Sequence, residues 1–241
     1  MLLKGRWPRA IFYDSKTTLF DWSWTWKQAA ARLVEKYQPR MTAQEFLEGW
    51  VKLFEGFHRR TAFYRYTPIT TLLQEALDTL YKVHGIPGSA SDVEEMVRLQ
   101  DEVQLFPETE EALTEQQRLD VKIIIYSDVE TKFLNMYVSK FKDFKPDFVG
   151  TTEQAGFHKP NPQTYFWVLR QMGMEARDVI YCAAPTFDIQ GAMACGLIAA
   201  WLRRPEGRLS RETHDAGLIP ADYEIESLND LTEIIKANRR L

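Results

Sequence analysis

Short runs of almost purely apolar residues recur along the chain, separated by longer amphipathic stretches. The clearest runs are 9–14, 121–126, 179–184 and 197–202, with weaker ones at 147–150 and 223–227. Continuous hydrophobicity, as opposed to strict alternation, is typical of strands that are buried on both faces of a parallel sheet. The pattern therefore predicts a parallel sheet built from these segments.

The stretches between the runs have helical periodicity. Helices are predicted at 110–118, 130–141, 162–172, 188–195 and 228–237. The third has clear ends, because Asn161 and Pro162 are favoured at a helix start and Gly173 is favoured just past a helix end. Strands that alternate with helices predict βαβ units and an α/β fold.

Residues 22–103 interrupt this alternation. No strand is predicted there, and four helical stretches follow one another at 24–38, 42–60, 68–84 and 89–103, separated by proline and glycine turns. The chain is therefore predicted to form an α/β core from residues 1–21 and 104–241. An all-α cap, residues 22–103, is inserted directly after the first strand.

Composition narrows the function classes. The 241 residues include 2 cysteines and carry a formal net charge of -4. An acidic chain is not expected to bind nucleic acid, and two cysteines cannot form a disulfide framework. No apolar run is long enough to span a membrane, and the first six residues lack the apolar segment of a signal peptide. We expect a cytoplasmic protein with a small-molecule partner, no nucleic-acid or membrane partner, and a homodimer as one open possibility.

The candidate chemistry lies where the predicted strands end, which is the edge at which parallel sheets bind ligands. Asp14 ends the first strand, and its carboxylate can act as a nucleophile that forms a covalent ester. The ammonium of Lys159 would keep Asp14 ionised, and Asp188 would orient Lys159 or activate water. The hydroxyls of Thr18 and Ser127 are candidates for binding an oxyanion.

Four segments in this order resemble the motifs of the haloacid dehalogenase superfamily. They are 14–21 with the nucleophilic Asp14, Ser127 after a strand, 159–162 with Tyr165, and Asp188 followed by Gly191 and Ala192. The helical segment lies where that superfamily places its type 1 cap, and the closest branch is the (S)-2-haloacid dehalogenases (type II). The resemblance implies a Rossmannoid core and a hydrolase without metal or cofactor. Its reaction would be displacement at a carbon alpha to a carboxylate.

Several site residues of that branch are replaced. Lys16 stands two positions after Asp14, where the superfamily's phosphatases have a second Asp and its dehalogenases have Tyr. Val51 stands near the position of the Arg that holds the departing halide. Ala183 and Pro185 replace a Ser and an Asn. These changes preserve the nucleophile and alter the groups around it.

Three alternatives to dehalogenation therefore stay open. One is a hydrolase that opens an epoxide or another strained ring, another is a phosphatase that requires Mg²⁺, and the third is a non-catalytic homologue that binds a small molecule. An anionic substrate is expected because two lysines lie at the site. The candidate substrate-binding residues are Ser15, Lys16, Asp128, Trp24 and Tyr165.

Two histidines near these motifs are given lesser roles. His58 begins a basic run that predicts a solvated helix face or, alternatively, anion contacts from the cap. His158 precedes Lys159 in a predicted loop and is interpreted as incidental.

Overall fold

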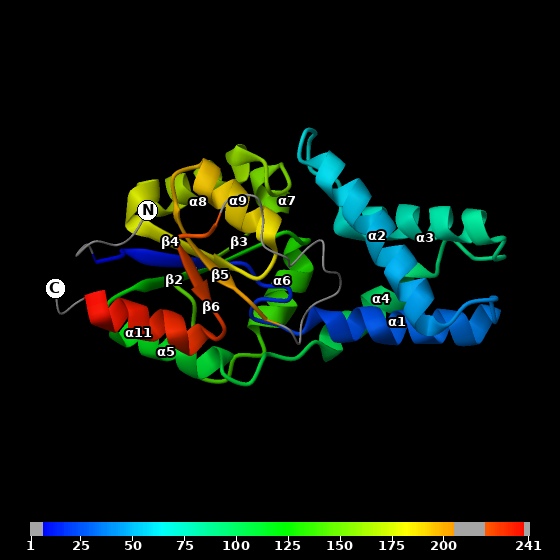
Figure 1. Cartoon of the computed structure of the whole chain (residues 1–241), viewed down its shortest axis with the longest axis horizontal. Coiled ribbons are helices and arrows are strands. Elements are labelled where there is room, and N and C mark those ends of the chain that lie inside the picture. Colours follow the sequence, from blue (N-terminus) through cyan, green and yellow to red (C-terminus); the bar gives the residue numbers. More distant parts are fainter. Residues whose placement is uncertain (1–6, 205–219, 239–241) are drawn as a thin grey trace.

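A single sheet of six parallel strands forms the centre of the computed structural model, which describes residues 7–204 and 220–238 (Figure 1). The strand order is β3-β2-β1-β4-β5-β6. Their bounds are β1 Ala10–Tyr13, β2 Lys122–Ser127, β3 Phe148–Thr151, β4 Val179–Ala183, β5 Ile198–Leu202 and β6 Tyr223–Ile225. All six predicted strands are confirmed, and the two weak ones form the edges of the sheet.

Helices cover both faces of the sheet. Alternate residues of β1 separate the two layers, because Ile11 and Tyr13 join one hydrophobic cluster while Ala10 and Phe12 join the other. The first cluster includes α5 (Thr109–Arg118), α6 (Thr131–Val138) and α11 (Leu228–Asn238). The second includes α8 (Pro162–Met172) and α9 (Thr186–Ala194). The predicted α/β class is thus confirmed. Two short helices, α7 (Thr152–Ala155) and η2 (Ala176–Asp178), complete this part.

The segment between β1 and α5 is a group of helices, here called the helical insertion (residues 22–102), and it lies beside the carboxyl ends of the strands (Figure 1). It contains α1 (Trp22–Tyr37), α2 (Ala43–Thr61), α3 (Ile69–His84), α4 (Val93–Arg98) and η1 (Leu99–Glu102). Asp21 caps α1, and Thr42 forms a capping box with Glu45 at the start of α2. The predicted domain boundaries at 21/22 and 103/104 stay a prediction.

The last helix of the insertion is shorter than predicted. A helix was expected over 89–103, but α4 begins at Val93 and η1 follows it. The carboxylate of Asp92 accepts hydrogen bonds from the Ser89 amide and from the hydroxyls of Tyr37 and Tyr81. Because these bonds fix residues 89–92 as a turn, the helix starts after them.

The longest described helix, α2, has 19 residues and is amphipathic, with Phe46, Trp50 and Phe54 on its buried side. Within the described parts of the chain, no helix combines the length and the apolar character that crossing a membrane requires.

Candidate active site

The loop after β1 is wound tightly enough to return Thr18 to the side of Asp14. The Ser15 carbonyl accepts hydrogen bonds from the amides of Thr18, Leu19 and Phe20, and Thr17 adopts a left-handed conformation with φ 61°. A β-branched residue in this conformation is strained, and such strain clusters at functional sites. The Thr18 hydroxyl donates to Asp14 Oδ2 at 2.9 Å and accepts from the Ala184 amide at 3.0 Å. Thr18 therefore fixes one oxygen of the candidate nucleophile.

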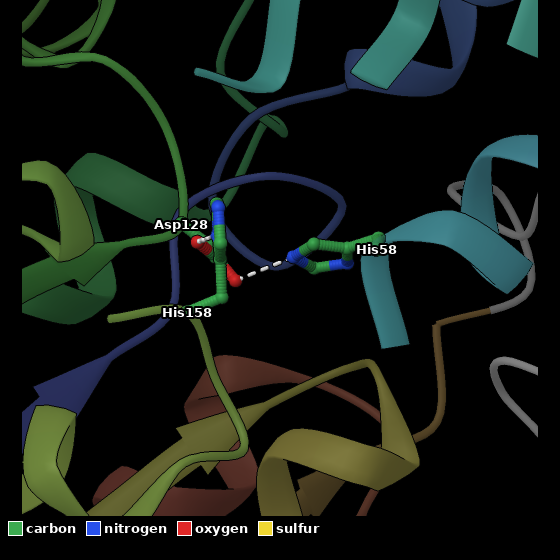
Figure 2. Close-up of side chains that lie close together, drawn as sticks. All are labelled: His58, Asp128 and His158. Carbon is green, nitrogen blue, oxygen red and sulfur yellow. Dashed lines mark hydrogen bonds and ion pairs between the residues drawn. The ribbon is translucent and has the colours of Figure 1, made fainter. Parts of the chain in front are cut away.

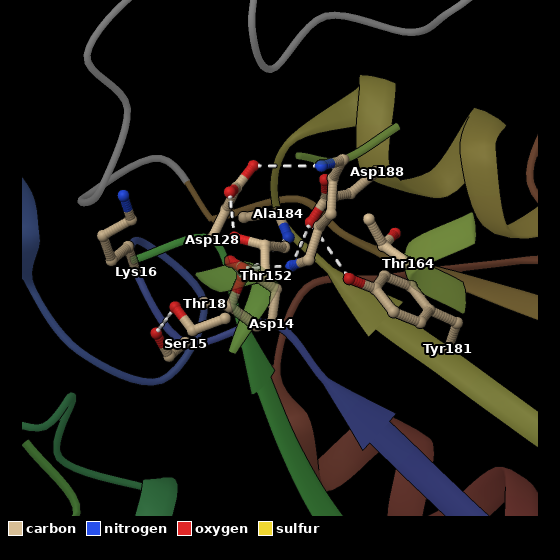
Figure 3. A network of polar contacts seen from close by, with 12 residues as sticks. Asp14, Ser15, Lys16, Thr18, Asp128, Thr152, Thr164, Tyr181, Ala184 and Asp188 are labelled. Carbon is tan, nitrogen blue, oxygen red and sulfur yellow. Dashed lines mark hydrogen bonds and ion pairs between the residues drawn. The ribbon is translucent and has the colours of Figure 1, made fainter. Parts of the chain in front are cut away.

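Lys159 joins the two carboxylates that the sequence predicted to meet. Its Nζ donates to Asp14 Oδ1 at 2.8 Å and to Asp188 Oδ2 at 2.9 Å, and the side chain is completely buried. The two carboxylates, Asp14 and Asp188, belong to the polar network drawn in Figure 3. Burial opposes the ammonium charge, but Asp14 and Asp188 outweigh it and raise the pKa of Lys159 above its usual value. The group is therefore a permanent cation beside Asp14.

Asp188 lies in the first turn of α9. One of its carboxylate oxygens has hydrogen-bond partners and the other has none. The Tyr181 hydroxyl donates to Oδ2 at 3.1 Å, whereas Oδ1 is buried without a hydrogen-bond partner. Burial, reinforced by the charge of Asp14, outweighs Lys159 and raises the pKa of Asp188 to about 7. A carboxylate with this pKa and a free oxygen is suited to accept a proton from water near neutral pH.

A cavity opens between these residues and the helical insertion. The core side contributes charged groups and the insertion contributes mainly aromatic ones. The lining residues are Asp14, Lys16, Thr17, Trp22, Trp26, Val51, Phe54, Glu55, His58, Asp128, Pro185, Phe187 and Asp188. Lys16 lies with its Nζ 4.0 Å from the centre of the Trp22 ring, and burial lowers the pKa of its ammonium. The cavity thus joins the candidate nucleophile, a cation and an aromatic wall.

Six predicted site residues do not line the cavity. Two of them, Thr18 and Lys159, are hydrogen-bonded to Asp14, and the other four lie elsewhere. The hydroxyls of Ser15 and Ser127 are buried and hydrogen-bonded to each other at 2.5 Å, so each already has a partner. Tyr165 packs beneath the site and donates its hydroxyl to the Asp188 carbonyl at 3.1 Å. Gly191 permits this contact, because a Cβ there would lie 2.5 Å from the Tyr165 hydroxyl oxygen.

Trp24 is the fourth of these residues, and the structure corrects its predicted position. The cavity is lined by Trp22 and Trp26, while Trp24 packs partly exposed against the hydrophobic core. Residues four apart share a helix face, whereas a residue two positions away points in nearly the opposite direction. Trp22 and Trp26 therefore form an aromatic wall of the cavity together, and Trp24, the candidate substrate-binding residue, is not part of it.

The carboxylate of Asp128 organises a second polar cluster at the cavity. His58 Nε2 lies 2.7 Å from Oδ2, and His158 Nδ1 lies 2.5 Å from Oδ1 (Figure 2). The Thr152 hydroxyl also donates to Oδ1, and the Lys159 amide donates to Oδ2. Burial would raise the pKa of Asp128, but the two histidines outweigh it and hold that pKa well below its usual range. Asp128 is therefore an anion.

The pKa values of the two histidines of this cluster are shifted in opposite directions. Burial opposes protonation of His158, but Asp128 outweighs burial and raises its pKa, and His158 Nε2 lies 2.7 Å from the Thr67 carbonyl. Burial dominates at His58 and lowers its pKa. Sequence reasoning treated His158 as incidental and gave His58 only a lesser role. The one sequence signal for His158 was that it directly precedes Lys159. No local pattern pairs His58 with Asp128, which lies 70 positions away.

The residues around Asp14 do not fit the Mg²⁺ ion on which the superfamily's phosphatases depend. The space between Asp14 and Asp188 is spanned by the Lys159 ammonium, and Lys16 replaces the second Asp. A divalent cation between Asp14 and Asp188 would meet the Lys159 ammonium that already occupies this space, with a second ammonium, that of Lys16, in the same cavity. The phosphatase alternative is not supported by this donor set.

The sequence and the fold define the class of protein. The family model of the haloacid dehalogenase-like hydrolases matches residues 11–202, so the chain belongs to this family. Among proteins of curated function, none is similar enough in sequence to match.

Two solved structures of L-2-haloacid dehalogenases and one of a putative HAD-hydrolase share the fold of this chain. The defluorinating L-2-haloacid dehalogenase Rha0230 has a TM-score of 0.79 at 22% identity, covering 97% of each chain. The L-2-haloacid dehalogenase from Xanthobacter autotrophicus with chloropropionic acid covalently bound has a TM-score of 0.78 at 20% identity, covering 95% of this chain and 98% of that one. The putative HAD-hydrolase YfnB from Bacillus subtilis, bound to magnesium, has a TM-score of 0.80 at 18% identity, covering 96% and 100%. At these identities the likeness concerns the fold.

Replacing Thr18 tests whether its hydroxyl positions the candidate nucleophile. Thr18→Val keeps the shape of the side chain but removes both hydrogen bonds, and it leaves the Ala184 amide unpaired at a cost of about 1–3 kcal/mol. We expect turnover to fall by about 10²-fold, since a small displacement of a reacting group has an effect of this size. Steady-state kinetics and urea denaturation measure the two effects. Thr18→Ser retains the hydroxyl and should recover most of the loss; equal effects of both variants would contradict this role.

Proposed function

We propose that the protein is a hydrolase that uses Asp14 to displace a leaving group from a carbon alpha to a carboxylate, through a covalent ester. The observation that supports this most is the setting of Asp14 itself. It is almost completely buried, each of its oxygens has one fixed partner, and it lies in the lining of the cavity. A desolvated carboxylate that is held in one orientation and lacks bulk water is a preorganised nucleophile.

The reaction then proceeds in two steps. In the first, an Asp14 oxygen forms a bond to the substrate carbon, and the bond from that carbon to the leaving group breaks. In the second, water adds to the carboxyl carbon of Asp14 and the ester bond breaks, which releases the hydroxy acid. Asp188, with its free Oδ1 and its pKa of about 7, accepts the proton of that water. Lys159 balances the negative charge that develops on the ester oxygens.

The same cavity accounts for the choice of an anionic substrate. Lys16 presents the one ammonium among the described residues that line the cavity, which makes it the group to bind a substrate carboxylate. Trp22, Trp26 and Phe54 form the apolar wall that would cover the rest of a small organic acid. Recognition would therefore combine a charge at one end with aromatic contact along the carbon chain.

Isotope labelling tests the ester mechanism directly. The protein, in excess over 2-haloacids and epoxy acids, is incubated in ¹⁸O water for a single turnover, and the peptide that contains Asp14 is weighed. We expect one ¹⁸O atom in Asp14, because water attacks the carboxyl carbon of the ester. If label enters only the product, water attacks the substrate directly and the proposal is wrong. Phosphate esters, tested in parallel with and without Mg²⁺, serve as the comparison.

A further inference from the structure

The cavity that Asp14 lines also carries a histidine that halide release would not use. Asp14 lies at a strand end, and residues of α1 and α2 of the helical insertion line the same cavity. Of the described residues that these helices contribute, four are apolar and two, Glu55 and His58, are polar. Displacement at a saturated carbon expels the leaving group on the side away from the nucleophile. The leaving group therefore departs into this cavity, which His58 also lines.

The partner of His58 suits it to carry a proton. His58 Nε2 is hydrogen-bonded to Asp128 Oδ2 at 2.7 Å, and Asp128 is held as an anion by His158, Thr152 and the Lys159 amide. A buried carboxylate that is bonded to an imidazole fixes the ring and stabilises its protonated form. His58 and Asp128 both line the same cavity as Asp14. The arrangement is thus an acid–base pair that shares a cavity with the nucleophile.

A metal site is the other chemistry that these three side chains could support, because one ligand atom from each of His58, Asp128 and His158 lies within 4.8 Å of the others. The contact lengths of 2.7 and 2.5 Å are hydrogen-bond lengths. Donor atoms around one tetrahedral zinc ion, each about 2.1 Å from it, lie more than about 3 Å apart. Asp128 also already accepts four hydrogen bonds. The geometry therefore favours proton transfer over metal binding.

We propose that His58, held by Asp128, donates a proton to the leaving atom, and that the substrate is a carboxylic acid carrying a strained oxygen or nitrogen ring. This inference rests on the proposed function and names its substrate class. A halide leaves as a stable anion without a proton, whereas a ring oxygen or nitrogen leaves as a strong base and needs one. The apolar Val51, which lines the cavity near the expected position of the dehalogenases' halide-binding Arg, agrees with this choice.

The ring opening balances without any further reactant. Asp14 forms the bond to the alpha carbon, the bond from that carbon to the ring heteroatom breaks, and the electron pair on the heteroatom takes the proton of His58. Water then hydrolyses the ester, and its proton passes through Asp188 to solvent while His58 is reprotonated. An epoxy acid and water thereby give a dihydroxy acid.

The charged groups around His58 determine whether its ring is protonated when a substrate carboxylate is bound. Asp128 favours a positive charge on the His58 ring, whereas His158 and Lys16 oppose it. Glu55, on the same helix as His58, also lines the cavity. Burial lowers the pKa of His58 in the free protein. The negative charge of a bound carboxylate, together with that of Asp128, favours the protonated ring.

Comparing two leaving groups in one variant tests the proposal. His58→Gln keeps a hydrogen-bond donor for Asp128 but cannot transfer a proton. We expect it to lower the turnover of oxirane-2-carboxylate by about 10²-fold or more, the usual contribution of a general acid. The turnover of 2-chloropropionate should fall by less than about tenfold, since chloride needs no proton. His84→Gln, at an exposed histidine of α3, is the matched control and should leave both rates unchanged.

The remaining outcomes each count against the proposal. Equal losses with both acids would make His58 a structural residue, and no loss with the epoxy acid would remove it from the reaction. A wild-type protein that dehalogenates without opening the epoxy acid would exclude the substrate class. Absence of ¹⁸O in Asp14 with either acid would instead overturn the proposed function, and the two failures are thereby distinguished.

A second variant guards against misfolding of the first. Asp128→Asn preserves the shape of the partner but removes the charge that stabilises protonated His58. Without this charge the pKa of His58 falls, so the ring loses its proton at a lower pH. Ring-opening activity should therefore disappear at a lower pH than in the wild-type protein. An unchanged pH profile would contradict the pairing.

Discussion

Asp14→Asn is expected to reduce turnover of every substrate by about 10⁴-fold or more, the scale on which removing a covalent nucleophile acts. The amide has nearly the shape of the carboxylate and can still accept the hydrogen bond from Thr18, so the site should keep its form. It lacks the negative charge that attacks the substrate carbon, and it is a poor nucleophile. The measurement is kcat under saturating substrate, together with the mass of the peptide that contains position 14.

The control for this variant is Asp143→Asn, which makes the same chemical change at an exposed aspartate far from the cavity. It should leave kcat unchanged. The peptide mass must show that the introduced asparagine has not been hydrolysed back to aspartate, because deamidation would restore activity. Substantial turnover by the intact Asp14→Asn variant would show that water attacks the substrate directly, and would leave Lys159 and Asp188 to act on that water.

The centre of the sheet was predictable from the sequence because β1, β2, β4 and β5 are almost completely buried. Each of these four strands is a short apolar run such as 121–126. This local signal also placed Asp14 and Asp188 at a common edge before any contact was known. The structure confirms that these carboxylates meet at Lys159.

The side of the cavity that the helical insertion lines could not be predicted in the same way. Whether His58 faces Asp128 depends on how α2 packs against the strand ends, which is a long-range property that no periodicity encodes. Trp24, the candidate substrate-binding residue, lies on another face of α1 and is absent from the cavity lining. Trp22 and Trp26 lie four positions apart and point into the cavity together.

Lys159→Met is expected to damage both stability and catalysis. The substitution preserves volume but leaves Asp14 and Asp188 as buried carboxylates without a counter-ion. Removing one partner of a buried ion pair typically destabilises a protein by about 3–5 kcal/mol. Turnover should fall by about 10³-fold or more, since the preorganised cation that stabilises the ester oxygens is lost. Urea denaturation and kcat measure the two losses. Lys122→Met, at the exposed start of β2, is the matched control and should leave both close to wild type.

The pH dependence of this loss separates an electrostatic cause from a packing defect. The pKa of Asp188 is raised in the folded protein, to about 7, from a usual value of 3.8. The folded state therefore binds the extra proton, and this contribution to stability is lost as pH rises through that range. Without Lys159 the carboxylates repel each other more strongly, so the folded pKa rises further and the loss becomes steeper. The stability deficit of Lys159→Met should thus be larger at pH 8 than at pH 5. A deficit that is equal at both pH values would indicate lost packing, and the ammonium would then not be what holds the two carboxylates together.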